Sequence, residues 1–461
     1  MSKSNSLAKI QGFFIFIIAI AILLHQLFNR NNSIPDIILY GCIVMVLFLF
    51  PTIKRSTFLI SLIMLVAGHI LLFYYDMNMD IWKSALSINL GLVSLFAFVP
   101  MLIIPISVGG YLYSIEMELK RLHSKPNSVY ILLSFLTFLL GSVVNLAVIR
   151  VLYPLFKQSR LSVKRLGKAM YIGFISTNIW SPYFASVAII LHFLDLPYTK
   201  LGPFLLTLAI THFVFGNIVI LFIAKKNNIE ELFSVELVDD VIGLKGNNGN
   251  RKKMIQLIVI MSIIFALLFI IEKITGQKMT VLVSVIGIVG SVVWLYSLGE
   301  KKVIENHMLK YIIYSLPKIS NELSLFICAG FFGIVVMNTP FNLIINNFVN
   351  EVAYKGSLIL LIGIIILLPV SLAFIGVHQI VTVTLLATSI SPETIGLSSI
   401  AYGVLLAAAW CHASGASPFS PLNMTLGSVL NKNSFKVGIG SNYLFLIGSI
   451  LITISFVNMI K

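Results

Sequence analysis

Two segments, STNIWSP at Ser176–Pro182 and SGASPFSP at Ser414–Pro421, decide the fold, because each interrupts an apolar stretch that is otherwise long enough to cross a bilayer. In each segment, small hydroxyl and amide residues are followed by an aromatic residue, a serine and a proline. A helix interrupted at membrane depth is tolerated only where its backbone is buried in protein or lines a water-filled cavity. Paired broken helices of this kind are typical of a transport site.

The composition places the chain in a membrane. Its 461 residues are 58% hydrophobic and 11% charged, with a mean hydropathy of +0.99, and a soluble fold of this length cannot bury so much apolar surface. The net charge of +15 comes from basic residues in loops between the apolar runs, so it indicates orientation and no nucleic-acid partner. The three cysteines lie apart within apolar runs, which argues against a disulfide framework or a metal site.

Apolar runs of about 20 residues predict the membrane spans. We expect an all-α polytopic membrane protein with about 11 transmembrane helices plus two re-entrant hairpins. The expected spans are residues 11–28, 34–53, 57–75, 88–115, 169–193, 201–224, 254–271, 279–298, 322–348, 395–430 and 438–460.

Two further runs, residues 129–156 and 357–390, are expected to be hairpins that enter and leave the membrane on one side. Each contains polar or helix-breaking residues near its middle: Gly141, Ser142 and Asn145 in the first, and Pro369, Ser371 and Gly376 in the second. With both runs as hairpins, most of the 32 Lys and Arg fall on the side of the N-terminus. The positive-inside rule then predicts a multi-pass plasma-membrane protein with a cytoplasmic N-terminus.

The order of elements predicts two inverted repeats. Pro154 precedes Pro182 by nearly the same number of residues as Pro392 precedes Pro421. In each half, a hairpin ends at the first proline and a broken helix contains the second. The predicted boundaries are an N-terminal helix at residues 1–33, a first inverted repeat at 34–224, a cytoplasmic linker at 225–253 and a second inverted repeat at 254–461. An odd number of spans between equivalent elements inverts the second copy, as in many transporters.

Four short segments resemble the ion transporter superfamily. The run Gly141–Pro154, with Asn145 near its start, resembles a hairpin tip of that superfamily, and the segments at Ser176–Asn178 and Ser414–Pro418 look like the loops of its discontinuous helices. The overall plan is most similar to the divalent anion–sodium symporter group. This resemblance implies a homodimer that moves its hairpin-bearing domain by an elevator-type motion. The second hairpin departs from the Ser-Asn-Thr signature, since it carries Gly376, Val377, His378 and Gln379.

Broken helices and hairpin tips have predictable ligands. A half-helix that begins in the membrane presents free N–H groups that stabilise an anion, and one that ends there presents carbonyls that suit sodium. We expect two half-sites for substrate and ions at these tips, with no cofactor except sodium as a coupling ion. Packing of small residues is the simpler alternative for any one hydroxyl. The first half-site comprises Ser142, Asn145, Ser176, Thr177, Asn178 and Ser181; the second comprises His378, Gln379, Thr382, Ser414, Gly415, Ser417, Ser420 and Asn423.

Three further ionisable residues remain open. Arg150 lies within the first hairpin, where it either neutralises substrate charge or extends its side chain to the cytoplasm. His378 and His412 lie beside the second hairpin tip and the second break, where they either bind substrate or a proton or simply pack. His25, His69, His192 and His212 have no such context.

Absent motifs narrow the function. No Asp or Glu lies deep in a predicted span, which disfavours a sodium–proton antiporter. No P-loop pattern occurs that would indicate ATP hydrolysis. No paired carboxylates or nucleophile motif supports an enzyme. We expect a secondary active transporter of a small anion, a carboxylate or an inorganic oxyanion, coupled to sodium. The alternatives are uncoupled anion efflux, a channel, or a flippase of a lipid-linked anionic substrate on the same scaffold.

Overall fold

The chain is an all-α polytopic membrane protein. The structure is a computed structural model that describes residues 3–28, 35–122, 124–159, 161–226, 249–299, 301–340, 347, 351–352 and 357–461. Within these ranges there are helices and turns but no strand. Eleven of the described helical segments are long and apolar enough to cross a membrane. Most of the expected linker at 225–253 lies outside the described residues.

The eleven candidate spans agree with the expected number but differ from the expected set at two places. The segment Pro126–Val144, the first arm of the first hairpin, is long enough to count as a span. The segment Asp36–Thr52, expected as a complete span, is shorter than the others. Length alone therefore does not separate a hairpin arm from a span.

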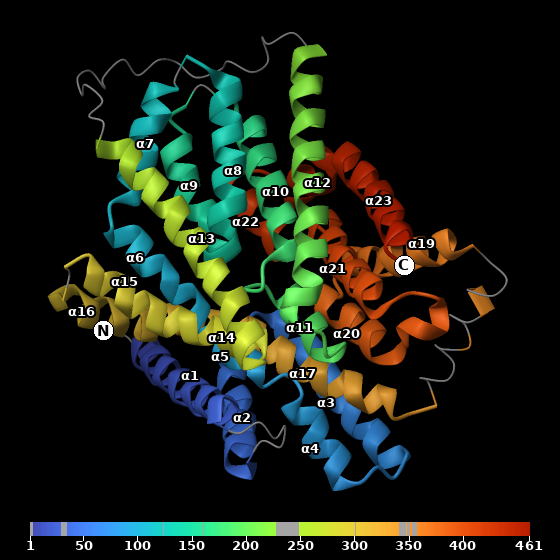
Figure 1. Cartoon of the computed structure of the whole chain (residues 1–461). Helices are drawn as coiled ribbons and strands as arrows, with labels where there is room; N and C mark the ends of the chain where they lie inside the picture. The colour runs from blue at the N-terminus through green and yellow to red at the C-terminus, as the bar shows by residue number, and fades with distance from the viewer. Residues whose placement is uncertain are drawn as a thin grey trace.

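The helices pack into two groups (Figure 1). The first, which we call the frame group, occupies the left and lower side of the view and draws on both halves of the chain. Its members are α1 (Lys3–Phe28), α2 (Asp36–Leu49), α3 (Arg55–Tyr74), α4 (Met79–Ser87), α5 (Gly91–Phe98), α6 (Ile103–Val108), α7 (Tyr111–Arg121), α13 (Gly249–Thr275), α14 (Met279–Val285), α15 (Ser291–Ser297), α16 (Lys301–Lys310) and α17 (Ser320–Met337).

The second group, the hairpin group, holds both hairpins and both broken helices. Its packing is mostly internal, with α8 against α10 and α19 against α21 as its largest contacts. Its members are α8 (Pro126–Val144), α9 (Ala147–Phe156), α10 (Val163–Trp180), α11 (Ala185–Phe193), α12 (Tyr198–Lys226), α19 (Leu358–Phe374), α20 (Gln379–Ser389), α21 (Ser399–Ala416), α22 (Pro421–Leu430) and α23 (Ser441–Met459).

The hairpin group contains the same order of elements twice: a hairpin, a broken helix and a long helix. Cys411 of α21 lies 3.1 Å from the carbonyl oxygen of Ile175 in α10. Gly415, one turn further along α21, lies against Tyr171, one turn earlier on α10. The two helices therefore cross antiparallel. Each hairpin's second arm also packs against the other copy's second half-helix, α9 against α22 and α20 against α11.

The structure moves one expected break and adds breaks to a run that was expected to be one helix. In the second hairpin, α19 continues through Pro369 and ends at Phe374, so the break falls at residues 375–378 around Gly376, which has φ +93°. The run 88–115, expected as one helix, is divided into α5, a 3-10 turn at Val99–Leu102, α6 and α7. The predicted repeat boundaries at 34–224 and 254–461 stay a prediction.

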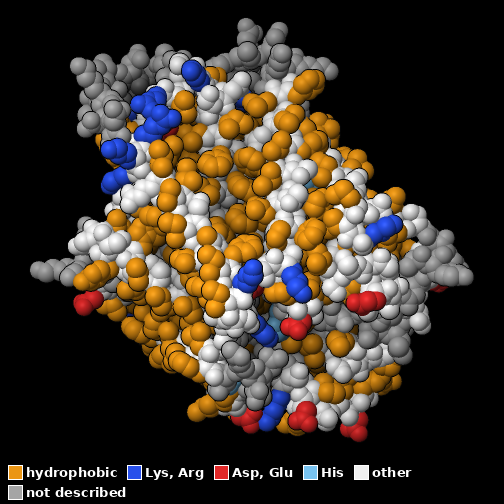
Figure 2. Space-filling view, viewed as in Figure 1, with side chains coloured by type: hydrophobic (Ala, Val, Ile, Leu, Met, Phe, Trp, Pro, Cys, Tyr) orange, Lys and Arg blue, Asp and Glu red, His pale blue; other side chains and the backbone are white. Residues whose placement is uncertain are grey.

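The outer surface is suited to lipid. Figure 2 shows hydrophobic side chains over most of the visible face, while Lys and Arg gather at the upper left over α7. The last turn of α7 carries Lys120 and Arg121. Such a separation of apolar belt and basic end is expected where spans leave the membrane.

Close packing of α8 on α10 depends on Gly173. A Cβ there would lie 2.4 Å from the carbonyl oxygen of Ser134 and 2.8 Å from the Cβ of Thr137. We expect Gly173→Ala to force the helices apart at a cost of about 1–3 kcal/mol, which thermal unfolding in detergent measures as a lower midpoint. Gly363→Ala on α19 is the matched control, because a Cβ added there would meet no described atom within 4 Å. Equal midpoints for both variants would contradict this packing.

Candidate functional site

At the first break, a serine ties the broken helix to the hairpin tip. The hydroxyl of Ser181, the first residue after α10, donates to the carbonyl of Ser142 at 2.5 Å and accepts from the amide of Tyr183. Thr177 Oγ1 lies 2.8 Å from the carbonyl of Phe138 in α8. The hydroxyl of Ser142 itself donates within α8, to Leu139. Three of the predicted residues therefore hold the tip and the break together.

The second break repeats this tie. The hydroxyl of Ser417 donates to the carbonyl of Ala373 at 2.6 Å and accepts from the amide of Phe419. Ser417 is thus the counterpart of Ser181, and Pro418 is the counterpart of Pro182. The expected pairing of Pro182 with Pro421 is wrong by three residues. The motif shared by the two breaks is a serine, a proline and an aromatic residue. It begins with the serine whose hydroxyl bonds to the adjacent hairpin.

The carbonyls that end the first half-helices already have donors. Asn423 Nδ2 donates to the carbonyls of Gly415 at 2.7 Å and Ser417 at 2.9 Å. At the first break, Tyr198 Oη donates to the carbonyl of Trp180 at 2.7 Å. Side-chain donors therefore occupy oxygen atoms that we expected to ligate a cation. Ser420 caps the start of α22 by accepting from the amide of Asn423, which gives these two predicted residues structural roles.

Other predicted residues keep free polar atoms. Thr382 Oγ1 and Ser176 Oγ are fully buried and have no hydrogen-bond partner among the described residues. The side chains of Gln379 and Ser414 are also buried and make no hydrogen bond within the described part of the chain. His378 Nδ1 accepts from the amide of Ile380, which caps α20. Because a buried polar group without a partner is costly, Thr382 Oγ1 and Ser176 Oγ are candidates for ligand contacts.

The side-chain oxygens of Asn178 and Asn145, in contrast, both accept hydrogen bonds. Asn178 Oδ1 accepts from the hydroxyl of Ser186 at 2.8 Å. Asn145 forms the first hairpin tip with φ +56° and ψ −144°, and its side-chain oxygen accepts from the amide of Leu146. This conformation is nearly exclusive to glycine, so a non-glycine residue there is strained, and such strain is concentrated at functional sites. Gly376 is the positive-φ residue of the second tip.

The two half-sites lie on opposite sides of the helix crossing. Ile175 and Cys411 each precede the serine of their own break by six residues, which is about 9 Å along a helix at ~1.5 Å per residue. Because α10 and α21 are antiparallel, the two breaks extend from the crossing in opposite directions. The predicted residues are therefore brought together as two clusters and not as one.

Sequence reasoning missed the partner of His412. His412 Nε2 and His212 Nε2 each lie 3.2 Å from Thr453 Oγ1, and both rings are fully buried. Thr453 also donates to the carbonyl of Ser449, so both histidines donate to Thr453 through Nε2. This cluster joins α12, α21 and α23. His212 has no recognisable motif, because only the fold brings it to His412.

The remaining ionisable candidates have clear positions. Arg150 is exposed on α9, which favours the account in which its side chain extends outward. The ring of His378 lies 6.2 Å from that of Trp410, which in turn stacks on Phe326 of α17 at 6.4 Å. The second tip is therefore covered by aromatic residues from both helix groups.

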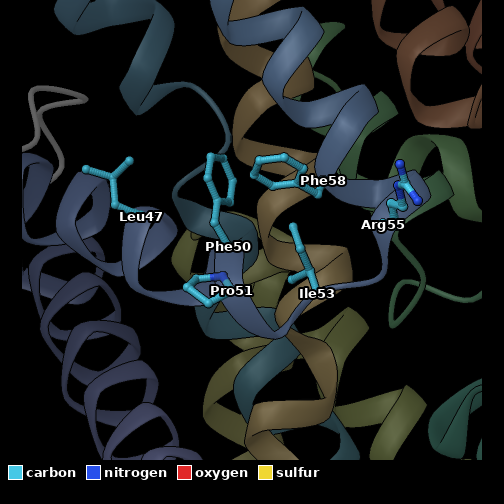
Figure 3. A pocket seen from close by; sticks show the side chains of 6 residues that line it. All are labelled: Leu47, Phe50, Pro51, Ile53, Arg55 and Phe58. Atoms are coloured by element: carbon cyan, nitrogen blue, oxygen red, sulfur yellow. The ribbon is translucent and has the colours of Figure 1, made fainter.

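One surface hollow lies away from the tips. It has a volume of about 370 Å³ and is formed where α2 turns into α3 (Figure 3). Its walls are mostly apolar, with Arg55 at one side. Neither break borders this hollow.

Comparison with known proteins supports the fold. No protein-family model matches the chain, and no curated protein matches its sequence. Among solved structures, the chain is similar to the YdaH transporter of Alcanivorax borkumensis, whose crystal structure was described as having an unusual topology. The TM-score is 0.60 at 12% identity, over 88% of this chain and 99% of that chain. The likeness shows a fold shared with a transporter and does not single out the divalent anion–sodium symporter group.

The strain at Asn145 gives a test of the first tip. We expect Asn145→Gly to raise the thermal midpoint, because glycine adopts this conformation without the cost of about 1–3 kcal/mol. Asn145→Val should lower the midpoint, since a β-branched residue is disfavoured there. The same detergent-purified samples measure both. A lower midpoint for Asn145→Gly than for the wild type would contradict the assigned tip geometry.

Proposed function

We propose that this protein is a secondary active transporter of a small anion, a carboxylate or an inorganic oxyanion, driven by a cation gradient, with sodium as the first candidate. The observation that carries the proposal is the repeated tie between a broken helix and a hairpin tip, made by Ser181 and by Ser417. An interruption at membrane depth is tolerated only where its backbone is buried in protein or lines a water-filled cavity, and paired broken helices are typical of transport sites. The transporter fold of the solved neighbour supports the same interpretation.

The free polar groups support an anion at the second tip. Gln379 begins α20, and Thr382 lies one turn further on, so both side chains face the same way at the positive end of a helix dipole. Ser414 at the end of α21 adds a hydroxyl. These groups suit carboxylate or oxyanion oxygens better than a cation.

Sodium coupling needs oxygen ligands. The carbonyls beside Asn423 and Tyr198 are already bonded, so a cation would have to displace a side-chain donor or use Asn145, Ser176 and the hydroxyls around them. We propose the first half-site for the coupling ion on this ground. The division into a frame group and a hairpin group supports an elevator-type motion of one past the other. We further propose a homodimer in the plasma membrane with a cytoplasmic N-terminus.

Flux in proteoliposomes tests this function directly. We expect accumulation of a radiolabelled dicarboxylate, sulfate or phosphate against its gradient when sodium is high outside, and none without a cation gradient. Flux that only follows the anion's own gradient would favour efflux or a channel. Movement of a lipid-linked anion between leaflets, without soluble-anion uptake, would favour a flippase.

Thr382 offers a substitution with a matched control. Thr382→Val removes an unpartnered buried hydroxyl and keeps the shape, so we expect an unchanged or higher thermal midpoint and at least tenfold lower flux. Thr384→Val removes another unpartnered buried hydroxyl from the same helix, but this residue packs on Gly333 of α17. Flux by the Thr384 variant should stay within twofold of wild type. Equal flux from both variants would refute the second half-site.

A further inference from the structure

One face of α13, a frame-group helix, covers the first break. The ring of Phe265 lies 4.8 Å from Trp180 and 5.8 Å from Tyr183, which flank the break. The ring of Phe269 lies 5.2 Å from Tyr198 at the start of α12. Phe265, Phe269 and Glu272 follow helical spacing, so they form one stripe. Aromatic residues of two groups therefore close the break from the frame side.

A buried carboxylate ends this stripe. Glu272 is 4% exposed, and its two carboxylate oxygens accept from the amides of Tyr198 at 2.8 Å and Thr199 at 2.6 Å. These amides belong to the first turn of α12, where helices lack internal partners and favour negative charge. Tyr198 also donates to the carbonyl of Trp180. Tyr198 is therefore bonded to Glu272 of α13 through its amide and to the break through its hydroxyl.

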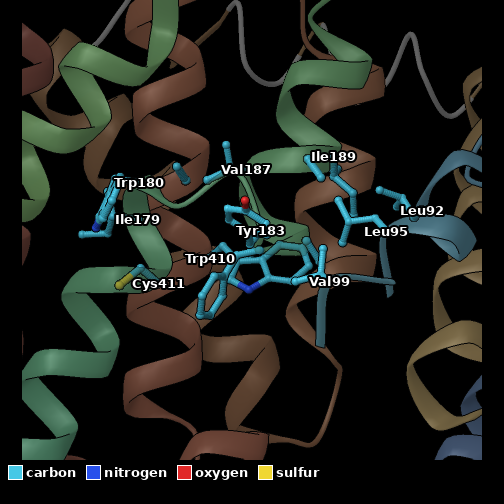
Figure 4. Packing of buried hydrophobic residues seen from close by; sticks show 14 of the residues in the cluster. Leu92, Leu95, Val99, Ile179, Trp180, Tyr183, Val187, Ile189, Trp410 and Cys411 are labelled. Atoms are coloured by element: carbon cyan, nitrogen blue, oxygen red, sulfur yellow. The ribbon is translucent and has the colours of Figure 1, made fainter. Parts of the chain in front are cut away.

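Contacts between the frame group and the hairpin group continue beyond the first break; we call this boundary between the two groups the seam. Figure 4 shows Val99, in the 3-10 turn after α5, beside Trp410 of α21, and Leu95 of α5 near Ile189 of α11. These contacts are apolar and non-directional, so they tolerate sliding. The two bonds to Glu272 are directional, and a buried carboxylate that loses both is strongly destabilised unless water reaches it. Glu272 therefore distinguishes a closed seam from an open one.

We propose that α13 is the gate over the first half-site and that Glu272 is the positioning residue that holds it closed. This inference rests on the proposed transport function. It identifies the contact between Glu272 and α12 as the one that must break before a ligand reaches the first break. The closed arrangement is the one seen here. Release separates the carboxylate from the start of α12 and moves Phe265 away from Trp180 and Tyr183.

Hydrogen exchange tests the gate without any transport assay. In nanodiscs, we expect Glu272→Ala to speed amide exchange at least tenfold across residues 183–190, which Glu272 does not touch. Lys273→Ala, an exposed neighbour on α13, should leave that exchange at the wild-type rate. Faster exchange confined to residues 197–202 would mean a local brace and would overturn the proposal, as would no change at all.

A reversible cross-link connects the gate to flux. We join the two cysteines of a Thr199→Cys, Glu272→Cys double variant with a reductant-cleavable bifunctional thiol reagent. The flux of the linked protein should be at least tenfold lower than before linking and should recover after reduction. Each single cysteine variant with the same reagent is the control. Equal flux in the linked and reduced states would overturn the gate. If wild type and all variants carry no anion, the proposed function fails, while the exchange data still decide whether α13 closes the break.

Discussion

The structure depends on one constraint: a backbone interrupted inside a membrane must have its polar groups satisfied by protein. Ser181 and Ser417 meet it in the same way, since each hydroxyl donates to a carbonyl at the adjacent hairpin tip and accepts from the amide two residues on. These ties fix each hairpin to its broken helix. The antiparallel crossing at Ile175 and Cys411 then places the two units on opposite sides.

Sequence patterns predicted the broken helices, both hairpins and the membrane class, because each has a local cause in apolar length, glycine, proline or clustered hydroxyls. They did not predict the register of the repeat. In the sequence, Ser417-Pro418 and Ser420-Pro421 are equally plausible counterparts of Ser181-Pro182. Only the hydrogen bond from Ser417 to Ala373 identifies the first pair as the counterpart. His212 and Glu272 were missed for a related reason, since their partners come from distant helices.

The two half-sites are related by fold but differ in chemistry. At both breaks a side-chain donor occupies a helix-end carbonyl, Tyr198 Oη at the first and Asn423 Nδ2 at the second. At the second, Thr382 near the start of α20 keeps an unpartnered hydroxyl. At the first, the strained Asn145 tip and the unpartnered Ser176 hydroxyl remain. The two breaks therefore share a backbone arrangement but not the same unpartnered groups.

The sidedness of the hairpin ends tests the central claim most directly. Single cysteines at Lys125 and Lys157 bracket the first hairpin, and those at Ser357 and Ser391 bracket the second. In sealed vesicles of known orientation, an impermeant maleimide should label both members of a pair from the same side, and the two pairs from opposite sides. Labelling of the two ends of one hairpin from opposite sides would show a complete span there and would contradict the inverted-repeat account.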